Sequence, residues 1–221
     1  MVSRLLVSLE PAARCTAAIA AGYGLGLLPS ARLAVWASGT DTDVERDGTG
    51  NPGAMNTSHL IGKRWGAAVF AADVAKGWGA AALGRRLLGA TGANTAAAAA
   101  VVAHCYPATR RFRGGKGVAT SIGQVLGTFP AYFPIDAGVA LATAAVPALR
   151  HRTFTANTVA SLTWVGCASA WWRKQWPNPG GPAPTAALPA AAAVSSVAIF
   201  ARFLAERDKV VSYEAAGMGE G

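Results

Sequence analysis

The sequence predicts an all-α, polytopic integral membrane protein, and three observations favour that fold class. Apolar residues make up 52% of the 221 residues and charged residues only 14%, against about 25% charged in ordinary soluble domains. Alanine and glycine dominate, whereas the β-branched and aromatic residues that favour strands are few. Apolar stretches recur, each near the ~20 residues that a bilayer requires. An Ala-rich soluble helical protein is the alternative, and the low charge favours the membrane protein.

About seven transmembrane helices are expected. The first stretch is longer than the apolar part of a signal peptide and is interpreted as a membrane helix. Dividing residues 117–149 into two short spans is optional, so the expected number is five to seven. The stretches cover residues 14–36, 65–83, 93–109, 117–130, 134–149, 154–172 and 186–204.

The remaining segments complete a single membrane-embedded domain over residues 1–214. The Pro- and Gly-rich stretch 177–184 is expected to be a loop, and residues 215–221 a disordered tail. The three cysteines, Cys15, Cys105 and Cys167, lie far apart in apolar surroundings and are interpreted as small buried residues. Their spacing predicts no metal site.

The charge distribution predicts an orientation in the membrane. Lysine and arginine number 20 against 11 acidic residues, a net charge of +9. An N-terminus outside the cell places most of these cations in cytoplasmic loops, as the positive-inside rule requires. A basic excess also suits phosphorylated substrates, anionic lipid or nucleic acid.

A first segment rich in glycine and amides, Asp47–Asn56, could bind an anion. Glycine lets backbone N–H groups turn toward an anion, and Asn and Thr side chains add donors. The alternative is a simple turn-rich loop. The preceding acidic residues, Asp41, Asp43, Glu45 and Asp47, are interpreted as a solvated face.

A second segment places Asp73 and Lys76 inside an apolar stretch. Both charges are costly in hydrocarbon, and their i, i+3 spacing puts them on one helical face where they can pair. The pair could serve the site or could be a structural ion pair.

A third segment, His104–Thr120, combines four cations with three glycines. Flexible backbone and cations suit phosphate. The order of Lys116 and Gly117 excludes a Walker A loop. Phe112 is the only aromatic residue interleaved with the cations, so an RNA contact is disfavoured. The alternative is a basic loop that only fixes topology. Together, the three segments suggest a site for phosphorylated molecules at the cytoplasmic surface.

These segments, GTGNPGAMN, DVAKG and HCYPATRRFRGGKGVAT, resemble in order and distance the motifs of the bacterial acyl-phosphate:glycerol-3-phosphate acyltransferases of the Y type. The segment GLGLLPSA, residues 24–31, looks like a further family motif. The resemblance implies a seven-helix inner-membrane enzyme with a cytoplasmic active site. It implies transfer of a fatty acyl group from acyl phosphate to the sn-1 hydroxyl of glycerol 3-phosphate, giving lysophosphatidate without a metal or cofactor. The implied partners are these two substrates and membrane lipid, with no nucleic acid.

The resemblance also implies roles for individual residues. The catalytic residues would be Thr49, Lys116 and His104. Substrate and phosphate binding would involve Gly50, Asn51, Gly53, Asn56, His59, Asp73, Lys76, Arg113, Gly114, Gly115 and Gly117. The chain departs from the family pattern most strongly where Met55 replaces a Thr, His59 an Arg, Phe203 a His and Glu206 an Asn. Milder changes put Thr49 for a Ser, Ala103 for a Gly and Arg113 for a Lys.

These departures leave three functions open. The first is an active acyltransferase, favoured by the intact Gly-Gly-Lys-Gly loop. The second is a non-catalytic family member that binds phospholipid or an active partner, favoured by the changes at His59, Phe203 and Glu206. The third is a small transporter for phosphorylated solutes, although no inverted repeat is apparent.

Overall fold

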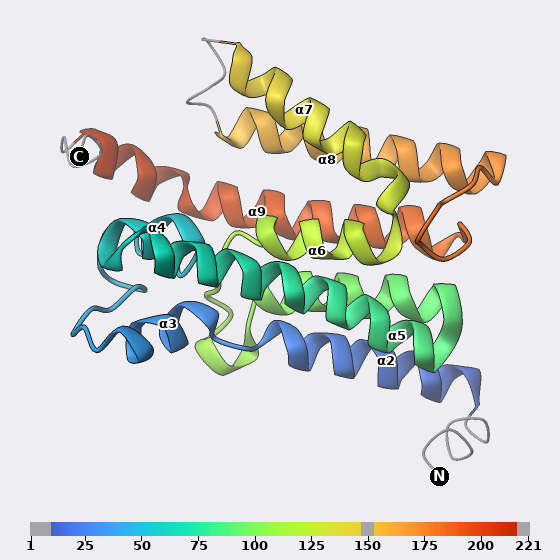
Figure 1. Ribbon diagram of the computed structural model, residues 1–221, viewed down its shortest axis with the longest axis horizontal. Coiled ribbons are helices and arrows are strands. Elements are labelled where there is room, and N and C mark those ends of the chain that lie inside the picture. Colours follow the sequence, from blue (N-terminus) through green and yellow to red (C-terminus); the bar gives the residue numbers. More distant parts are fainter. Residues whose placement is uncertain (1–9, 147–152, 216–221) are drawn as a thin grey trace.

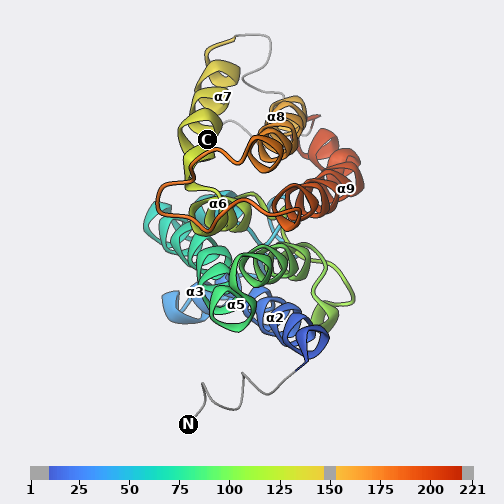
Figure 2. The ribbon, with the colours of Figure 1, turned by 90° about the vertical axis from the view of Figure 1, so that its right-hand side faces the viewer.

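The computed structural model describes residues 10–146 and 153–215, and these residues form helices and no strands, as predicted. Figures 1 and 2 show the helices stacked in layers. α2 (Pro11–Gly26) lies at one side and packs on α5 (Lys63–Cys105). α6 (Val118–Thr128) and α9 (Ala187–Ala215) cover the other side of α5. α8 (Thr153–Lys174) and α7 (Phe133–Ala145) lie beyond them.

The first predicted span, residues 14–36, is two helices rather than one. α2 ends at Gly26, and α3 begins at Ser30 and ends at Ser38. The prediction of a continuous helix is wrong because Pro29 has no N–H to donate and disfavours the helical conformation in the residue before it. The break exposes the backbone carbonyl of Leu28, which becomes available to a side chain from another helix.

The second and third predicted spans, residues 65–83 and 93–109, are the two arms of α5. The helix folds back at Leu88 and Gly89, whose backbone angles are not helical; Gly89 has φ of +57°. The arms approach so closely that a side chain at Gly84 would collide with the carbonyl of Gly92. The second arm ends at Cys105 rather than 109 because Pro107 ends the helix.

Two short elements complete the part of the fold around the site. α4 (Ala54–Ile61) precedes α5, and the 3-10 helix η1 (Ala108–Arg110) follows it. Tyr23 of α2 donates a hydrogen bond to the Tyr106 carbonyl at 2.9 Å and accepts one from the Ala108 backbone at 3.1 Å. These bonds fasten the segment after α5 to the first helix.

The stretch 117–149 contains two helices, α6 and α7. They are joined by the 3-10 helix η2 (Pro130–Tyr132) and bent by 115° relative to each other. By length and hydropathy, the described residues hold two segments able to cross a membrane, Pro11–Ser38 and Ala187–Glu206, and a third if α6 and α7 form one bent span. The expected number of five to seven spans stays a prediction.

The C-terminal helix is longer than expected. α9 continues to Ala215, which was assigned to a disordered tail, and residues 216–221 lie outside the described part of the chain. The predicted loop 177–184 lies within the non-helical link between α8 and α9. Cys105 is buried as predicted, whereas Cys15 and Cys167 are only half-buried.

Close packing of the helices depends on small residues, as is common in membranes. A side chain at Gly22 of α2 would strike the Ala96 carbonyl of α5, and one at Gly26 would strike that of Ala100. On the other face of α5, Gly123 of α6 packs directly against the Val74 carbonyl. α5 is therefore held tightly between α2 and α6.

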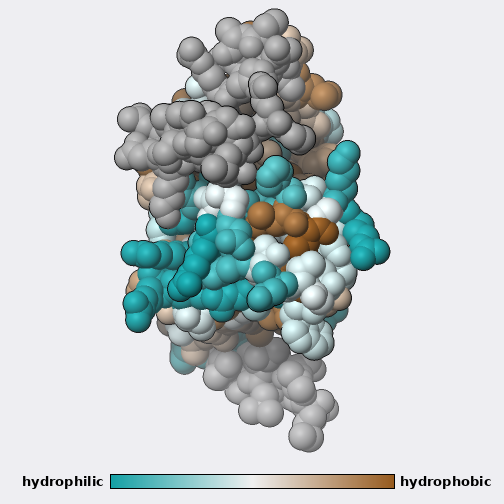
Figure 3. Space-filling view, turned by 90° about the vertical axis from the view of Figure 1, so that its left-hand side faces the viewer, coloured by the Kyte–Doolittle hydropathy of each residue, from teal (hydrophilic) through white to brown (hydrophobic). Residues whose placement is uncertain are grey.

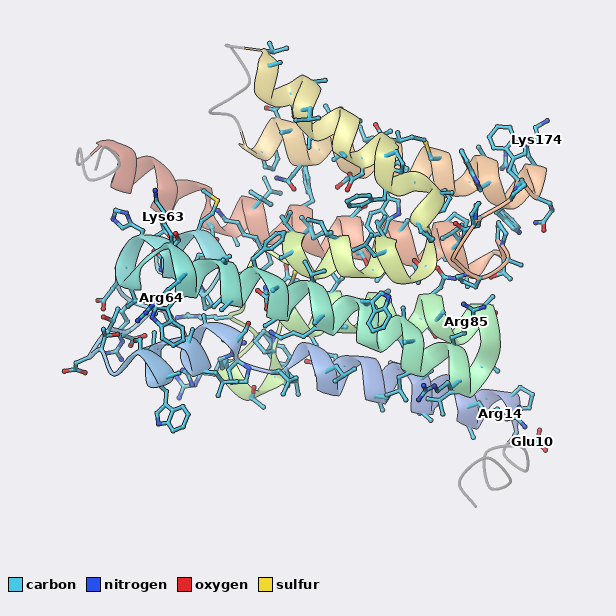
Figure 4. The ribbon with its side chains drawn as sticks, viewed as in Figure 1. Glu10, Arg14, Lys63, Arg64, Arg85 and Lys174 are labelled. Atoms are coloured by element: carbon cyan, nitrogen blue, oxygen red, sulfur yellow. The ribbon has the colours of Figure 1, made fainter. Side chains whose placement is uncertain are left out.

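Charged side chains mark the two ends of the molecule. Figure 4 shows Lys63 and Arg64 at one end, and Arg14, Arg85 and Lys174 at the other. With the N-terminus outside, the predicted spans place Lys63 and Arg64 on the cytoplasmic side and Arg14, Arg85 and Lys174 on the other. Figure 3 shows hydrophilic residues gathered over the first of these ends.

Candidate functional site

The loop Arg113–Gly117 lies directly on the end of α5. The backbone N–H of Gly114 donates to the Cys105 carbonyl, and that of Gly115 to the His104 carbonyl, both at 3.1 Å. A Cβ at Gly114 would collide with the His104 carbonyl, and one at Gly115 with Nε2 of the His104 ring. The glycines therefore permit this close approach, and their two N–H groups are already engaged by α5.

α9 holds the same loop from the other side. Arg202 donates to the Gly114 carbonyl at 2.6 Å and also pairs with Glu206 one turn later. Nζ of Lys116 lies 3.8 Å from Oε2 of Glu206 and 4.9 Å from the centroid of the Phe203 ring. Lys116 is thus held by an aromatic face and a carboxylate.

The Asp73–Lys76 ion pair predicted from the sequence is present. Nζ of Lys76 lies 2.7 Å from Oδ1 of Asp73 and also donates to the Leu28 carbonyl at 2.6 Å and to Oγ of Ser30 at 2.9 Å. Ser30 in turn donates to Asp73 at 2.5 Å. An ammonium group has three N–H donors, and here each has an acceptor. The network therefore joins the α2–α3 break to α5.

His104 lies between these two groups of residues. Its Nδ1 is 3.7 Å from Oδ1 of Asp73, and its carbonyl accepts the bond from Gly115. The side chain is buried near the end of α5. His104 thus connects the Asp73 network to the glycine loop.

Asn56 organises the first motif. Its Oδ1 accepts the backbone N–H of Thr49 at 3.0 Å, and its Nδ2 donates to the carbonyls of Val44 and Asp47, each at 3.1 Å. Gly48 and Gly50 supply left-handed turns, with φ of +60° and +65°. All of these bonds are local, so Asn56 stabilises the fold of the loop in addition to any role that it has toward a ligand.

Asn51 differs from Asn56 because its buried Oδ1 has no hydrogen-bond partner among the described residues. Thr49, Gly50 and Gly53 are half-buried around it. This motif therefore keeps an unused acceptor at Asn51.

Glu45 joins the first motif to the third. It binds Arg32 through two contacts, at 2.8 and 2.9 Å, and Arg110 at 3.2 Å. The interpretation of the acidic run as a solvated face is therefore wrong for Glu45, although Asp41, Asp43 and Asp47 are exposed. Two arginines surround Glu45 because it lies in the gap between α3 and η1.

Two predicted phosphate-binding residues lie on the surface. His59, in the last turn of α4, and Arg113, at the start of the glycine loop, are both exposed. Within residues 10–146 and 153–215, no group of three His, Cys, Asp or Glu side chains could hold a metal ion.

Sequence reasoning did not assign Ser30, Glu45 or Arg110 to the site. Ser30 follows Pro29, a signal for a helix start that could have placed it at a break. The contacts of Glu45 with Arg32 and Arg110 cross 13 and 65 positions of sequence, and no local pattern reports such contacts. Arg202 and Glu206 have the i, i+4 spacing of a helical ion pair, a signal that was available.

Comparisons with known proteins identify the family of the chain. Residues 16–212 match the family described as glycerol-3-phosphate acyltransferase. The glycerol-3-phosphate acyltransferase of Thermoanaerobacter sp. (strain X514) is 46% identical over 88 residues, which are 40% of this chain and 44% of that protein. The one from Exiguobacterium sibiricum is 42% identical over 112 residues, 51% and 54% of the two chains. The chain thus spans about half the length of these curated relatives.

A solved structure shares the fold. The crystal structure of PlsY (YgiH), an integral membrane glycerol 3-phosphate acyltransferase, in its glycerol 3-phosphate form has a TM-score of 0.69 and 23% identity. The match covers 90% of this chain and 92% of the chain in that structure. Because the family match covers most of the sequence, the chain belongs to the glycerol-3-phosphate acyltransferase family.

Proposed function

We propose that this chain transfers a fatty acyl group from acyl phosphate to the sn-1 hydroxyl of glycerol 3-phosphate. The products would be lysophosphatidate and inorganic phosphate. The observation that carries the proposal is the glycine loop fixed between α5 and α9, with the partly exposed side chain of Lys116 projecting from it. Of the three functions considered from the sequence, family membership favours this one.

Catalysis would depend on orientation and charge. The glycerol hydroxyl attacks the acyl carbonyl carbon, the bond from that carbon to the phosphate oxygen breaks, and the hydroxyl proton ends on the departing phosphate. Lys116 and Arg113 would offset the repulsion between the two phosphates. Because the N–H groups of Gly114 and Gly115 already bond to α5, the Lys116 side chain is the principal phosphate contact in this proposal.

The other substrate would be oriented by the first motif. Thr49 supplies a hydroxyl and Asn51 an unpartnered amide oxygen, and both can position a polyol. His104, beside Asp73 and against Gly115, would orient the reacting hydroxyl or bind phosphate. Asp73, Lys76 and Asn56 would act by holding these segments in place.

The acyl chain would occupy an apolar cavity next to the loop. A cavity of about 320 Å³ lies among α6, α7, α8 and α9 and is lined by Val118 and Ser121 of α6 and by Ile199 of α9. Val118 follows Gly117 directly, and Ile199 precedes Arg202 by one turn. A chain in this cavity would bring its carboxyl end to Lys116.

We further propose that the protein lies in the bacterial inner membrane with the site facing the cytoplasm and the N-terminus outside. Lys63 and Arg64 lie at the opposite end of the molecule from Arg14, Arg85 and Lys174, as residues on two sides of a membrane would. The excess of cations in the loops expected on the side of Lys63 and Arg64 supports the direction. Labelling of a Lys63→Cys variant by an impermeant reagent, from each side of sealed vesicles, tests it. Labelling of the Lys63→Cys variant from the side of the membrane that faces the cell exterior would contradict the proposed orientation.

The decisive measurement is phosphate release from palmitoyl phosphate by the purified protein, with and without glycerol 3-phosphate. We expect release that requires the acceptor and equals the lysophosphatidate formed. A Lys116→Gln variant serves as the control for the site. Release that is independent of glycerol 3-phosphate would mean hydrolysis, and no release would contradict the proposed activity.

A further inference from the structure

Glu206 places a buried carboxylate at the phosphate-facing loop. Glu206 is only 8% exposed, and the two oxygens of its carboxylate face two different cations, Arg202 and Lys116. Arg202 also holds the Gly114 carbonyl. An anion is thus already present where the site is proposed to receive the phosphate of a substrate.

The two contacts of Glu206 differ in tightness. Arg202 and Glu206 are adjacent on one helical face and share a direct hydrogen bond. The Lys116 contact is longer, at 3.8 Å, and the Lys116 side chain is 24% exposed against 11% for Arg202. Arg202 is therefore the fixed partner, and Lys116 is the cation that an incoming anion can reach.

We propose that Glu206 competes internally with substrate phosphate for Lys116 and so weakens the binding of that phosphate. A phosphate that binds Lys116 must draw the amine away from Glu206, and it must do so close to a like charge. Both effects lower the affinity for a doubly charged phosphate. The Phe203 ring keeps Lys116 near the loop in both states, since a cation–π contact needs no counter-charge.

The opposing interpretation is that Glu206 only neutralises Arg202 within an apolar helix. Removing one partner of a buried ion pair is destabilising, so that role predicts loss of stability without tighter phosphate binding. The two interpretations differ in the sign of the change in phosphate affinity. This inference rests on the proposed function only in assuming that Lys116 meets a phosphate.

The test compares Glu206→Gln with Glu10→Gln, which makes the same change in net charge at the far end of the molecule (Figure 4). Glutamine keeps the length of the side chain and an oxygen for Arg202. Binding of inorganic phosphate and of glycerol 3-phosphate to the purified proteins is measured by calorimetry. We expect Glu206→Gln to lower Kd by up to about fivefold, the scale of one partly exposed ion pair, and Glu10→Gln to leave it unchanged.

A second pair of variants identifies the cation. In a Lys116→Gln background, Glu206→Gln is expected to lose its effect on Kd. Tighter phosphate binding by Glu206→Gln in the Lys116→Gln background would mean that Arg202, not Lys116, is the cation for which Glu206 competes. Unchanged or weaker binding by Glu206→Gln in the parent protein would overturn the competition itself.

Acyl transfer, assayed separately, distinguishes the two proposals. Tighter phosphate binding without acyl transfer would retain the inference and reject the enzymatic function. Acyl transfer by the parent protein, with a phosphate affinity that Glu206→Gln leaves unchanged, would retain the enzymatic function and reject the inference. The absence of both phosphate binding and acyl transfer would reject both proposals.

Discussion

Two ion pairs on different helices of this protein contain the same chemical groups but are built in opposite ways. Around Asp73, every N–H of Lys76 has an acceptor within 2.9 Å, and both residues are almost fully buried. Around Glu206, the amine of Lys116 lies 3.8 Å from its carboxylate partner, and the Lys116 side chain is partly exposed. Each donor of the Lys76 ammonium is thus in use, whereas Lys116 is held less tightly. We therefore expect the first pair to be the frame of the site and the second its ligand-facing part.

The frame should show the largest effect on stability. Either Asp73→Asn or Lys76→Met alone leaves a buried group without its partner and should cost about 3–5 kcal/mol of unfolding free energy. The double variant should lose less than the sum of the two single losses. A double-mutant cycle on unfolding in detergent measures this coupling. Additive losses would mean that the pair does not act as a unit.

Lys116 should show the second-largest effect, on activity rather than stability. Lys116→Ala should lower kcat/KM by the equivalent of about 2–4 kcal/mol, as for loss of another preorganised electrostatic donor. The Tm should change little because the side chain is partly exposed and makes no short contact. Steady-state kinetics and thermal unfolding, measured on the same preparation, separate the effect on activity from the effect on stability. Near-normal kcat/KM would remove Lys116 from the site.

The contrast between the two pairs also separates what sequence could predict from what it could not. Asp73 and Lys76 are three residues apart in an apolar stretch, so a helix alone brings them together. Their saturation depends on Leu28 and Ser30, more than 40 positions earlier, and on a helix break that hydropathy does not report. Hydropathy is averaged over a long stretch of residues. It therefore predicts helices and their approximate positions, but it does not report a break within one stretch.

The glycine loop shows the same limit. Its composition indicated phosphate binding by flexible backbone and cations, but the N–H groups of Gly114 and Gly115 bond to the end of α5. Which partner an N–H finds is decided by tertiary packing, because every buried backbone donor must be satisfied. The place of Lys116 beside this loop follows from the sequence alone, and its role in phosphate binding stays a prediction.

Gly115 connects the frame to the ligand-facing loop and should show an intermediate effect. Gly115→Ala would drive a Cβ into the His104 ring, which is buried against Asp73. We expect a loss of roughly 1–3 kcal/mol of stability, as for overpacking, together with reduced acyl transfer.

Gly79→Ala is the matched control, because a side chain there meets no atom within 4 Å. It should be neutral or slightly stabilising, since alanine favours a helix more than glycine does. Unfolding curves for both variants provide the comparison. Equal effects at the two positions would mean that His104 moves aside at no cost.

The smallest effect is expected at His59, which lies outside both ion pairs. It is exposed in the last turn of α4, so a charge placed there acts through water and is worth less than about 1 kcal/mol. If phosphate passes this position, His59→Arg should lower KM for glycerol 3-phosphate by less than about fivefold. High salt should abolish the gain, because exposed charges are screened. His59→Gln should keep the original KM. A KM that His59→Arg leaves unchanged at low salt would exclude His59 from phosphate recognition, and a gain that persists in high salt would place it inside the site.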